Sequence, residues 1–433
     1  MKSCWTALRF AVLGATVAGC IKIPPFQGGG DAGGDGSDAT GDGSMQDPAA
    51  TATVVSGTIV ASVPSLYQVA FSTEPYHFPF SMTVGTTSLI AGDNPECAGE
   101  YGVGVSLYPA TRITGHQGTG VAQEDIHIDL AGPPVAKVSL DWATQFGCGG
   151  TNTGDATGRS TFTFFPDGHI NRSEIVHIPA MLDGSMCTCS GTADNWHISS
   201  FLTVNRAVLN PTVIGAAVPT DNGAGIAVTQ PTLCFTGNQN SFQFAMAWRS
   251  SGSTFRLRTP PTTGTGTLAF VYDLSSSTPS MTIGPNYDGE GQTTWWVGTT
   301  SNCSDLRTAV EPYSTGGTLP LPELNIASGN DPPTSYGVAL DGIFGGENGQ
   351  STAGTGYPSN VVTLSPSGAP LGAFAFWIQL HNGADLQSVE KMPMTPQGTW
   401  YAVQTPPGHP NDRVFWFPDG LKSGESIVIT GTQ

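Results

Sequence analysis

The sequence predicts an all-β protein made of antiparallel β-sandwiches, either one large sandwich or two packed ones, with long loops and few helices. Apolar and polar residues alternate with a period of two in many segments after residue 53, which is the pattern of half-buried strands. Charged residues are only 11% of the chain, so the helix formers Lys, Glu and Arg are scarce. Gly and Pro number 57 and 33, which favours many turns.

The clearest alternation lies at residues 242–249, where Phe242, Phe244, Met246 and Trp248 occupy every second position. Residues 255–258 alternate Phe and Leu with Arg in the same way. Successive side chains of a strand point to opposite faces, so each segment has one apolar face. Further strands are expected at residues 53–60, 106–108, 268–274, 294–297, 374–380 and 400–404.

Turn residues separate several of these segments. Pro166-Asp167-Gly168 stands between the apolar run 161–165 and residues 169–178, and Pro418-Asp419-Gly420 stands between 414–417 and a strand ending near 430. Pro fits the first corner of a type I turn, and Gly fits the left-handed position after it. We therefore predict a hairpin at both places, and another tight turn at Asn382-Gly383.

The N-terminus has the features of a processing segment. Lys2 and Arg9 precede a short apolar run at 10–18, which is too short to span a membrane. The run ends in Val17-Ala18-Gly19-Cys20, which resembles the lipobox of bacterial lipoproteins. That resemblance implies a signal peptide at 1–19, removed on export, and a diacylglycerol with fatty acids such as palmitate on Cys20. The alternative is an ordinary signal peptide with an incidental cysteine.

The segment after Cys20 is expected to be a linker. Ile21 and Lys22 stand where an Asp is typical of inner-membrane lipoproteins, so the resemblance implies the outer membrane of the cell envelope. Residues 27–50 are of low complexity, rich in Gly and Asp and without Lys, Arg or aromatic residues. Such a composition predicts a flexible, acidic spacer. A calcium-binding repeat is the alternative, but the Asp spacing is irregular.

We expect four segments in the chain: the signal peptide 1–19, the lipidated N-terminus and linker 20–52, a first β-sandwich domain 53–210 and a second one 211–433. The boundary is placed where Asn210-Pro211 and residues 219–223 interrupt the alternation. A second irregular stretch, rich in proline, covers 311–333, and a glycine-rich loop covers 345–358.

Charge and cysteine usage restrict the partners. The formal net charge is −18 and falls to −20 without Lys2 and Arg9; such a surface repels nucleic acid and anionic lipid, so neither is expected as a partner. Besides Cys20, the exported chain has an even number of cysteines, which favours up to three disulfides over a zinc site. These cysteines are Cys97, Cys148, Cys187, Cys189, Cys234 and Cys303.

Two polar clusters are candidate sites. Asp125, His127 and Asp129 alternate with apolar residues, so they share one strand face and either form a metal or acid–base site or simply face solvent. His169, Glu174 and His177 flank the first Pro-Asp-Gly turn and have the same two interpretations.

Asn286, Asp288 and Glu290 offer oxygen ligands within Asn-Tyr-Asp-Gly-Glu-Gly. They form either a calcium site or an Asp-Gly turn. No other cofactor is expected.

Aromatic residues give a third kind of candidate. Trp295 and Trp296 are adjacent, so in a strand they point to opposite faces. If only one face is buried, one indole is exposed and can stack on a sugar ring.

No catalytic motif of a known class is present, so the composition and the anchor favour a binding protein for a glycan or a protein partner. The alternatives are an extracellular polysaccharide hydrolase or lyase, and a purely structural envelope protein.

Overall fold

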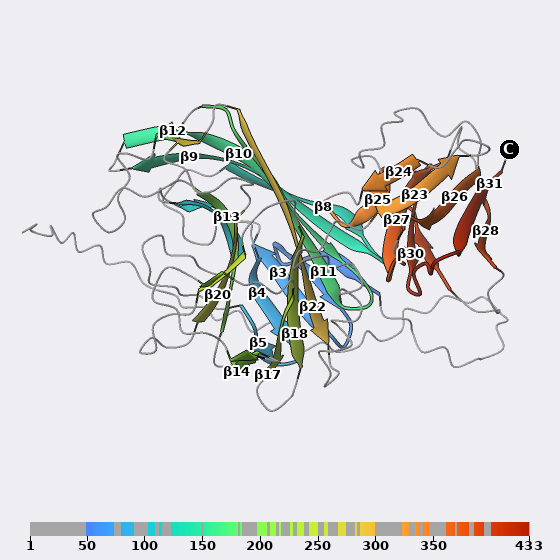
Figure 1. Cartoon of the computed structure of the whole chain (residues 1–433), viewed down its shortest axis with the longest axis horizontal. Coiled ribbons are helices and arrows are strands. Elements are labelled where there is room, and N and C mark those ends of the chain that lie inside the picture. The colour runs from blue at the N-terminus through green and yellow to red at the C-terminus, as the bar shows by residue number, and fades with distance from the viewer. Residues whose placement is uncertain are drawn as a thin grey trace, which may run out of the picture. The chain divides into compact units, whose positions relative to one another are not determined.

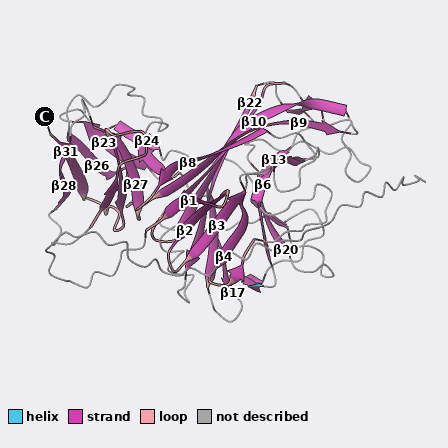
Figure 2. Cartoon of the chain, turned by 180° about the vertical axis from the view of Figure 1, so that it is seen from behind, coloured by secondary structure: helices cyan, strands magenta, loops and turns pink. Residues whose placement is uncertain are grey.

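The computed structural model describes residues 49–72, 79–90, 103–108, 112–114, 123–148, 151–180, 182–183, 197–205, 208–213, 216–217, 226–227, 232–237, 242–249, 255–258, 267–273, 282–283, 286–298, 323–328, 334–337, 341–345, 361–368, 370–380, 385–393 and 400–432. The chain divides into two compact units, Met1–Met45 and Gln46–Gln433. All the described residues belong to the second unit, and nearly all of them lie in strands and the turns between them (Figures 1 and 2).

A nine-stranded antiparallel sheet is the largest element of the described chain (Figure 1). Its long central strands have the alternation of apolar and polar residues that places one face in a core. In spatial order its strands are β15 (Ala216–Ala217), β14 (Leu209–Val213), β17 (Thr232–Gly237), β18 (Gln243–Arg249), β22 (Tyr287–Gly298), β11 (His169–Ile178), β10 (Thr151–Phe164), β9 (Ala136–Cys148) and β8 (Gln123–Ala131).

Two further sheets contribute to the core beside it. A five-stranded meander is built from β1 (Thr51–Val55), β2 (Thr58–Val63), β3 (Tyr67–Ser72), β4 (Pro79–Val84) and β5 (Thr87–Ser88). A six-stranded sheet has the order β16 (Ile226–Ala227), β19 (Phe255–Arg258), β20 (Thr267–Asp273), β13 (His197–Asn205), β6 (Val103–Tyr108) and β7 (Arg112–Thr114). β12 (Leu182–Asp183) pairs with β21 (Thr282–Ile283).

Aromatic side chains join the meander to the nine-stranded sheet. Phe71 of β3 packs edge-to-face against Phe162 of β10, with ring centroids 5.3 Å apart. Both rings belong to one core cluster, to which β6 adds Val103 and Val105 and β13 adds Leu202 and Val204. Burying a side chain of this size contributes about 1.5–3 kcal/mol, so this core stabilises the described strands between residues 50 and 297.

A second sandwich follows in the C-terminal part of the chain. One sheet has the order β24 (Thr334–Gly337), β23 (Glu323–Ser328), β26 (Val361–Pro366), β31 (Ser426–Gly431) and β28 (Leu386–Met392). The other has the order β25 (Ile343–Gly345), β27 (Phe374–Gln379), β30 (Asp412–Phe417) and β29 (Ala402–Gln404), with β25 parallel to β27. The two sheets enclose their own core, which includes Leu364, Phe376, Phe415 and Ile429.

The fold class predicted from the sequence is confirmed, since all the described strand pairs except β25–β27 are antiparallel. The expected strands are present with two changes, of which the smaller is that β29 covers only 402–404 of the expected 400–404. Residues 53–60 form two strands rather than one, because Ser56 and Gly57 adopt φ values of 50° and 77° and close a β1–β2 hairpin. Both residues are in the left-handed region that a two-residue hairpin turn requires.

The domain boundary expected at 210/211 does not coincide with a break in strand pairing. β11 and β22 lie on either side of residue 210 in the sequence, yet they pair over ten residues. The described residues instead divide into two hydrophobic cores, one ending at Val297 and the next beginning at Leu324. The interval overlaps the first part of the proline-rich stretch 311–333.

The two Pro-Asp-Gly segments have different structures. Pro166-Asp167-Gly168 closes the predicted β10–β11 hairpin, with Gly168 at a φ of 93° and its N–H donating to the carbonyl of Phe165 at 3.0 Å. Pro418-Asp419-Gly420 connects β30 to β31, which lie in different sheets. The predicted second hairpin is therefore wrong. β31 pairs instead with β26 and β28, because its alternate residues Ile427 and Ile429 complete the C-terminal core.

A third, smaller cluster joins the C-terminal sandwich to the nine-stranded sheet. Phe165 contacts Trp416, with ring centroids 5.4 Å apart. The side-chain amide of Gln404 donates to the carbonyl of Val135 at 2.9 Å and accepts from its N–H at 3.2 Å. The C-terminal sandwich is thus fixed on the sheet by apolar and main-chain contacts together.

Helices contribute little to the described residues. No helix among them is long and apolar enough to cross a membrane.

Candidate functional site

The face of the nine-stranded sheet opposite the core, called here the outer face, carries polar side chains in rows across β8, β9, β10, β11 and β22. Strand register sets these rows, because residues directly opposite one another lie about 4.5–5.5 Å apart on the same face. Asp125 pairs with Asp141, Asp141 with Arg159, and Arg159 with Ile175. The next row toward one end of the strands contains Ala143, Thr157, His177 and Asp288.

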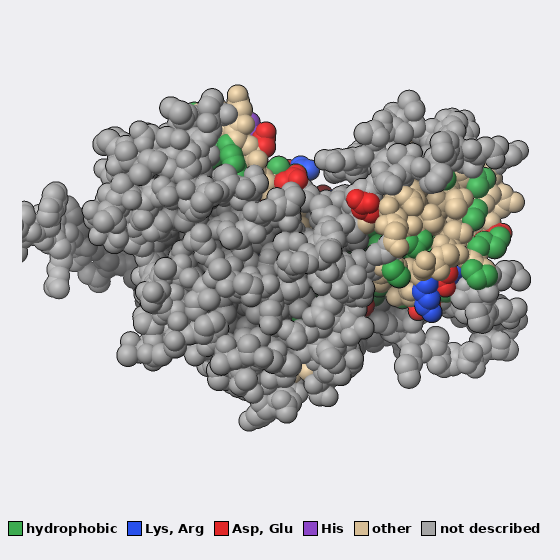
Figure 3. All heavy atoms as spheres, in the orientation of Figure 1, with side chains coloured by type: hydrophobic (Ala, Val, Ile, Leu, Met, Phe, Trp, Pro, Cys, Tyr) green, Lys and Arg blue, Asp and Glu red, His purple; other side chains and the backbone are tan. Residues whose placement is uncertain are grey.

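These rows surround an open hollow of about 530 Å³, the outer hollow. Small residues, Ala143 and Thr157, lie between larger polar ones, which produces the depression. Where β9, β10 and β22 run in Figure 1, acidic, basic and histidine side chains lie beside hydrophobic ones (Figure 3). The hollow is lined by Asp125, Asp141, Trp142, Ala143, Thr157, Gly158, Arg159, Ile175 and His177.

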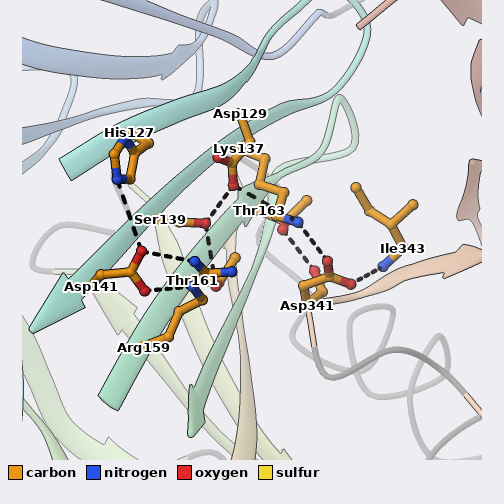
Figure 4. Close-up of polar contacts among 10 residues, drawn as sticks. All are labelled: His127, Asp129, Lys137, Ser139, Asp141, Arg159, Thr161, Thr163, Asp341 and Ile343. Carbon is orange, nitrogen blue, oxygen red and sulfur yellow. Dashed lines mark hydrogen bonds and ion pairs between the residues drawn. The ribbon is translucent and has the colours of Figure 1, made fainter. Parts of the chain in front are cut away.

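An Arg–carboxylate pair is the strongest polar contact of the hollow. The Nε and Nη2 atoms of Arg159 donate to the two carboxylate oxygens of Asp141 at 2.6 and 2.7 Å (Figure 4). These hydrogen bonds hold the pKa of Asp141 below its ordinary value and raise the pKa of Arg159. Both groups are therefore ionised at neutral pH, and the side chains remain 42% and 43% exposed.

The predicted polar cluster is divided between two environments. His127 Nε2 lies 3.4 Å from Asp125 Oδ2 and 3.9 Å from Asp141 Oδ2, so it lies beside two carboxylates that line the hollow. Asp129 lies at a β-bulge, where the β8–β9 register shifts between Ile128 and Leu130. Its carboxylate accepts from Ser139 Oγ and lies 3.8 Å from Lys137 Nζ. The bulge thus gives Asp129 different partners from Asp125 and His127.

The residues around the first turn are also separated. His177 Nδ1 contacts Asp288 Oδ1 at 2.7 Å on the exposed part of the outer face. His169 Nδ1 contacts Asp167 Oδ1 at 2.5 Å within the turn itself. Glu174 faces the core on the other side of the sheet and is 2% exposed. The three residues therefore do not form one site.

The structure corrects the calcium interpretation of Asn286, Asp288 and Glu290. Asp288 and Glu290 belong to β22, where alternate side chains project in parallel, about 6–7 Å apart, rather than converging as in a loop. Asp288 is already paired with His177. Among the described residues, no group of three or more His, Cys, Asp or Glu side chains is arranged to hold a metal ion.

The sugar-stacking interpretation of Trp295 and Trp296 is also corrected. Trp295 is 1% exposed within the core, and Trp296 is 7% exposed on the outer face. Both faces of β22 are covered at this point, so neither indole is accessible for stacking.

The cysteine predictions lie outside the described side chains. Cys20, Cys97, Cys187, Cys189 and Cys303 fall outside the described residues. Cys148 and Cys234 lie in β9 and β17, of which only the backbone is described at these positions. Lipidation and disulfide formation therefore remain predictions.

Sequence reasoning missed Asp141, Arg159 and Ile175, the residues that line the hollow with Asp125. Asp141 and Arg159 are 18 residues apart and meet only through the β9–β10 register. The sequence did hold a signal for this contact, because Gly149-Gly150 separates residues 136–148 from 151–164 and Gly-Gly is typical of a two-residue hairpin turn.

No protein-family model matches this chain, and no curated protein matches its sequence. Among solved structures, the chain is similar to a putative aldose 1-epimerase from Klebsiella pneumoniae, with 6% identity, a TM-score of 0.40, and coverage of 61% of this chain and 85% of that one.

The heparan sulfate lyase HepC from Pedobacter heparinus aligns at 7% identity and a TM-score of 0.35, over 75% of this chain and 42% of its own. A TPR-domain containing protein from Parabacteroides distasonis aligns at 10% identity and a TM-score of 0.36, over 56% and 47%. The chain thus spans less than half the length of these two proteins. The carbohydrate-related proteins among these neighbours are distant ones, and likeness at this level gives no activity.

Proposed function

We propose that this chain is an exported lipoprotein, anchored through Cys20 in the outer membrane of a bacterial cell envelope, which binds a neutral glycan in the outer hollow. The lipobox resemblance of Val17-Ala18-Gly19-Cys20 supports the anchor. The lining of the outer hollow is the observation that carries the glycan proposal, because it combines ionised hydrogen-bonding groups with an exposed apolar side chain.

The polar part of the lining matches sugar hydroxyls, which both donate and accept hydrogen bonds. The carboxylates of Asp125 and Asp141 are acceptors, and the Arg159 guanidinium has five N–H donors. Asp141 engages two of them, at Nε and Nη2. The contact also fixes the guanidinium plane, so little side-chain entropy is lost when a ligand binds.

The apolar part of the lining matches the carbon face of a sugar ring. Ile175 is 46% exposed although it lies in the middle of a long strand. It stands directly opposite Arg159 in the β10–β11 register. A ring lying across β10 and β11 would therefore contact an aliphatic surface and hydrogen-bonding groups together.

Charge favours a neutral glycan over an acidic one. The carboxylates of Asp125, Asp141 and Asp288 lie in or beside the hollow, and the Arg159 cation is already paired with one of them. A uronic acid or sulfated sugar would meet net negative potential there.

A glycan-array screen of the full chain carrying Cys20→Ser tests the glycan proposal. We expect binding to uncharged oligosaccharides and at least a tenfold loss in Arg159→Ala, because a hydrogen bond to a charged group contributes about 1.5–3 kcal/mol. Glu390→Gln is the control. Glu390 lies at an exposed position of β28, outside the hollow, so this variant should bind like the parent. Equal binding by parent and Arg159→Ala, or binding to acidic glycans only, would refute the proposal.

A hydrolase or lyase is the alternative that the same preparation tests. Oligosaccharide release that disappears in His127→Ala would favour an enzyme, because His127 lies beside the carboxylates of Asp125 and Asp141. The lowered pKa of Asp141 makes it a poor proton donor, so in a paired-carboxylate hydrolase Asp141 would be the base or nucleophile and another group the acid.

The anchor has a separate test. Mass spectrometry of the native protein should show a mature N-terminus at Cys20 carrying diacylglycerol. An unmodified N-terminus at any other residue would refute the anchor and leave the glycan proposal untouched.

A further inference from the structure

Lys137 and Asp341 form a buried pair between the nine-stranded sheet and the C-terminal sandwich. Lys137 Nζ lies 2.6 Å from Asp341 Oδ2, and the two side chains are 6% and 16% exposed (Figure 4). The residues are 204 positions apart in the sequence. We propose that they are joined by an intramolecular amide bond between Lys137 Nζ and Asp341 Cγ, formed with the help of Asp129.

Asp341 is held in place by contacts that do not involve its own carboxylate. Its main-chain carbonyl accepts from Thr163 Oγ1 at 2.6 Å. The next residue, Gly342, has a φ of 84°, and a Cβ there would lie 2.9 Å from the Asn171 side chain. The segment therefore approaches the sheet as closely as a glycine allows, and it presents the carboxylate of Asp341 to Lys137 in one orientation.

The carboxylate is also polarised for attack. The N–H of Ile343 donates to Asp341 Oδ1 at 3.1 Å, while Oδ2 faces the lysine. A backbone donor on Oδ1 stabilises the negative charge that develops on this oxygen in a tetrahedral intermediate. Apolar side chains, including those of Leu130, Val135 and Ile343, pack in the cluster next to the pair.

Asp129 supplies the proton transfer. Its Oδ2 lies 3.8 Å from Lys137 Nζ and accepts a hydrogen bond from Ser139 Oγ, which orients it. The bulge at Asp129 is what brings this carboxylate to the lysine. Asp129 is thus placed beside the amine from which general acid–base catalysis must remove a proton.

The reaction is a condensation that needs no other reactant. One ammonium proton passes from Lys137 to Asp341 Oδ2, and the neutral amine attacks Cγ to form the N–C bond. Asp129 takes a second proton from the nitrogen and passes it to Oδ2. The Cγ–Oδ2 bond then breaks, and Oδ2 leaves as water, so that two hydrogens and one oxygen are lost. The pair stays in contact after folding, which gives the high effective concentration such a step requires.

The chain contains a matched control pair. Lys391 Nζ lies 3.0 Å from Glu425 Oε2, and the two side chains are 6% and 20% exposed. Lys391 also donates to the carbonyl of Gly420. The ion pairs described for this lysine include no second carboxylate, so the proton carrier is missing and no amide is expected.

Peptide mapping of the reduced, denatured full chain tests the inference. After trypsin digestion we expect a branched peptide that joins the Lys137 and Asp341 segments, with a mass one water below the sum of the two linear peptides and no cleavage after Lys137. Lys391 should be cleaved normally. Linear Lys137 and Asp341 peptides at full mass, in protein that is folded, would refute the amide bond. The result is independent of the proposed glycan binding, which no part of this test measures.

The variant Asp129→Asn tests the assigned role of Asp129. It keeps Lys137 and Asp341 but removes the proton acceptor, so the branched peptide should be lost while circular dichroism stays unchanged. Lys137→Arg retains a cation and should also give only linear peptides. A branched peptide in undiminished yield from Asp129→Asn would overturn the role of Asp129.

Discussion

Two arginine–carboxylate pairs lie on opposite faces of the nine-stranded sheet and differ in almost every physical respect. On the outer face Arg159 and Asp141 are 43% and 42% exposed, while on the core face Arg172 and Glu174 are 1% and 2% exposed. Arg172 Nε donates to Glu174 Oε1 at 2.5 Å. The Arg172 guanidinium also lies 5.5 Å from the Phe162 ring centroid and 5.9 Å from that of Trp295.

The shift in pKa has opposite causes in the two pairs. Hydrogen bonds from Arg159 lower the pKa of Asp141, whereas burial raises the pKa of Glu174 and lowers that of Arg172. Glu174 also accepts from Ser160 Oγ, which in turn accepts from Trp142 Nε1 at 3.2 Å. The buried pair is thus part of a polar network within the core, and the exposed pair is available to a ligand. The same pair of groups is thus buried in the core on one face and exposed to solvent on the other.

Breaking the buried pair is expected to have the largest effect. Glu174→Ala leaves the Arg172 cation desolvated and without its carboxylate, which should lower the free energy of unfolding by about 3–5 kcal/mol. Urea denaturation followed by tryptophan fluorescence measures this change. A loss below about 1 kcal/mol would mean that the core face is hydrated at this position, contrary to its burial.

Replacing both buried groups should cost much less than replacing one. In Arg172→Met with Glu174→Leu no charge is left in the core, so most of the stability lost in Glu174→Ala should return. Ser160 would lose its acceptor, which leaves a residual cost of about 1 kcal/mol. The same denaturation experiment on the double variant checks this, and a loss that equals or exceeds that of Glu174→Ala would contradict it.

Breaking the exposed pair should hardly change stability. Arg159→Ala is expected to lower the free energy of unfolding by about 0.2–1 kcal/mol, because water and salt screen the pair. The loss should shrink further at 1 M salt, while the loss in Glu174→Ala should not. A double-mutant cycle with Asp141→Ala, run at low and high salt, measures the coupling directly.

The smallest expected effect is that the stability difference between the parent and Arg159→Ala depends on pH. The pKa of Asp141 is lowered in the folded state, so its contribution is present above its ordinary value of 3.8 and is lost as the pH falls through the lower folded value. Parent and Arg159→Ala should therefore converge in stability below about pH 3.8. A difference that stays constant from neutral to acid pH would mean that Arg159 acts through packing rather than charge.

Much of the fold was predictable because its signals are local. Alternation in 242–249 and 374–380 predicted β18 and β27, and Pro166-Asp167-Gly168 predicted the β10–β11 hairpin. Arg172 and Glu174 also had a local signal, since they share a strand face with Ile170 and Val176. A pair of opposite charges on an otherwise apolar face indicates an internal ion pair. The calcium and sugar-stacking predictions were wrong because they depended on loop structure and on exposure, which neighbouring segments decide.

The sequence by itself determined the all-β class, the strand faces and the first hairpin, because these depend on residues a few positions apart. Tertiary structure alone decided the rest. Register across β9 and β10 brought Asp141 to Arg159. Strand pairing placed β30 and β31 in different sheets, so the second Pro-Asp-Gly segment connects two sheets and does not close a hairpin. The packing of the C-terminal sandwich against the sheet brought Asp341 into contact with Lys137, which lies 204 residues earlier in the sequence. The contact between Lys137 and Asp341 forms only when distant strands meet, so no local pattern contains it.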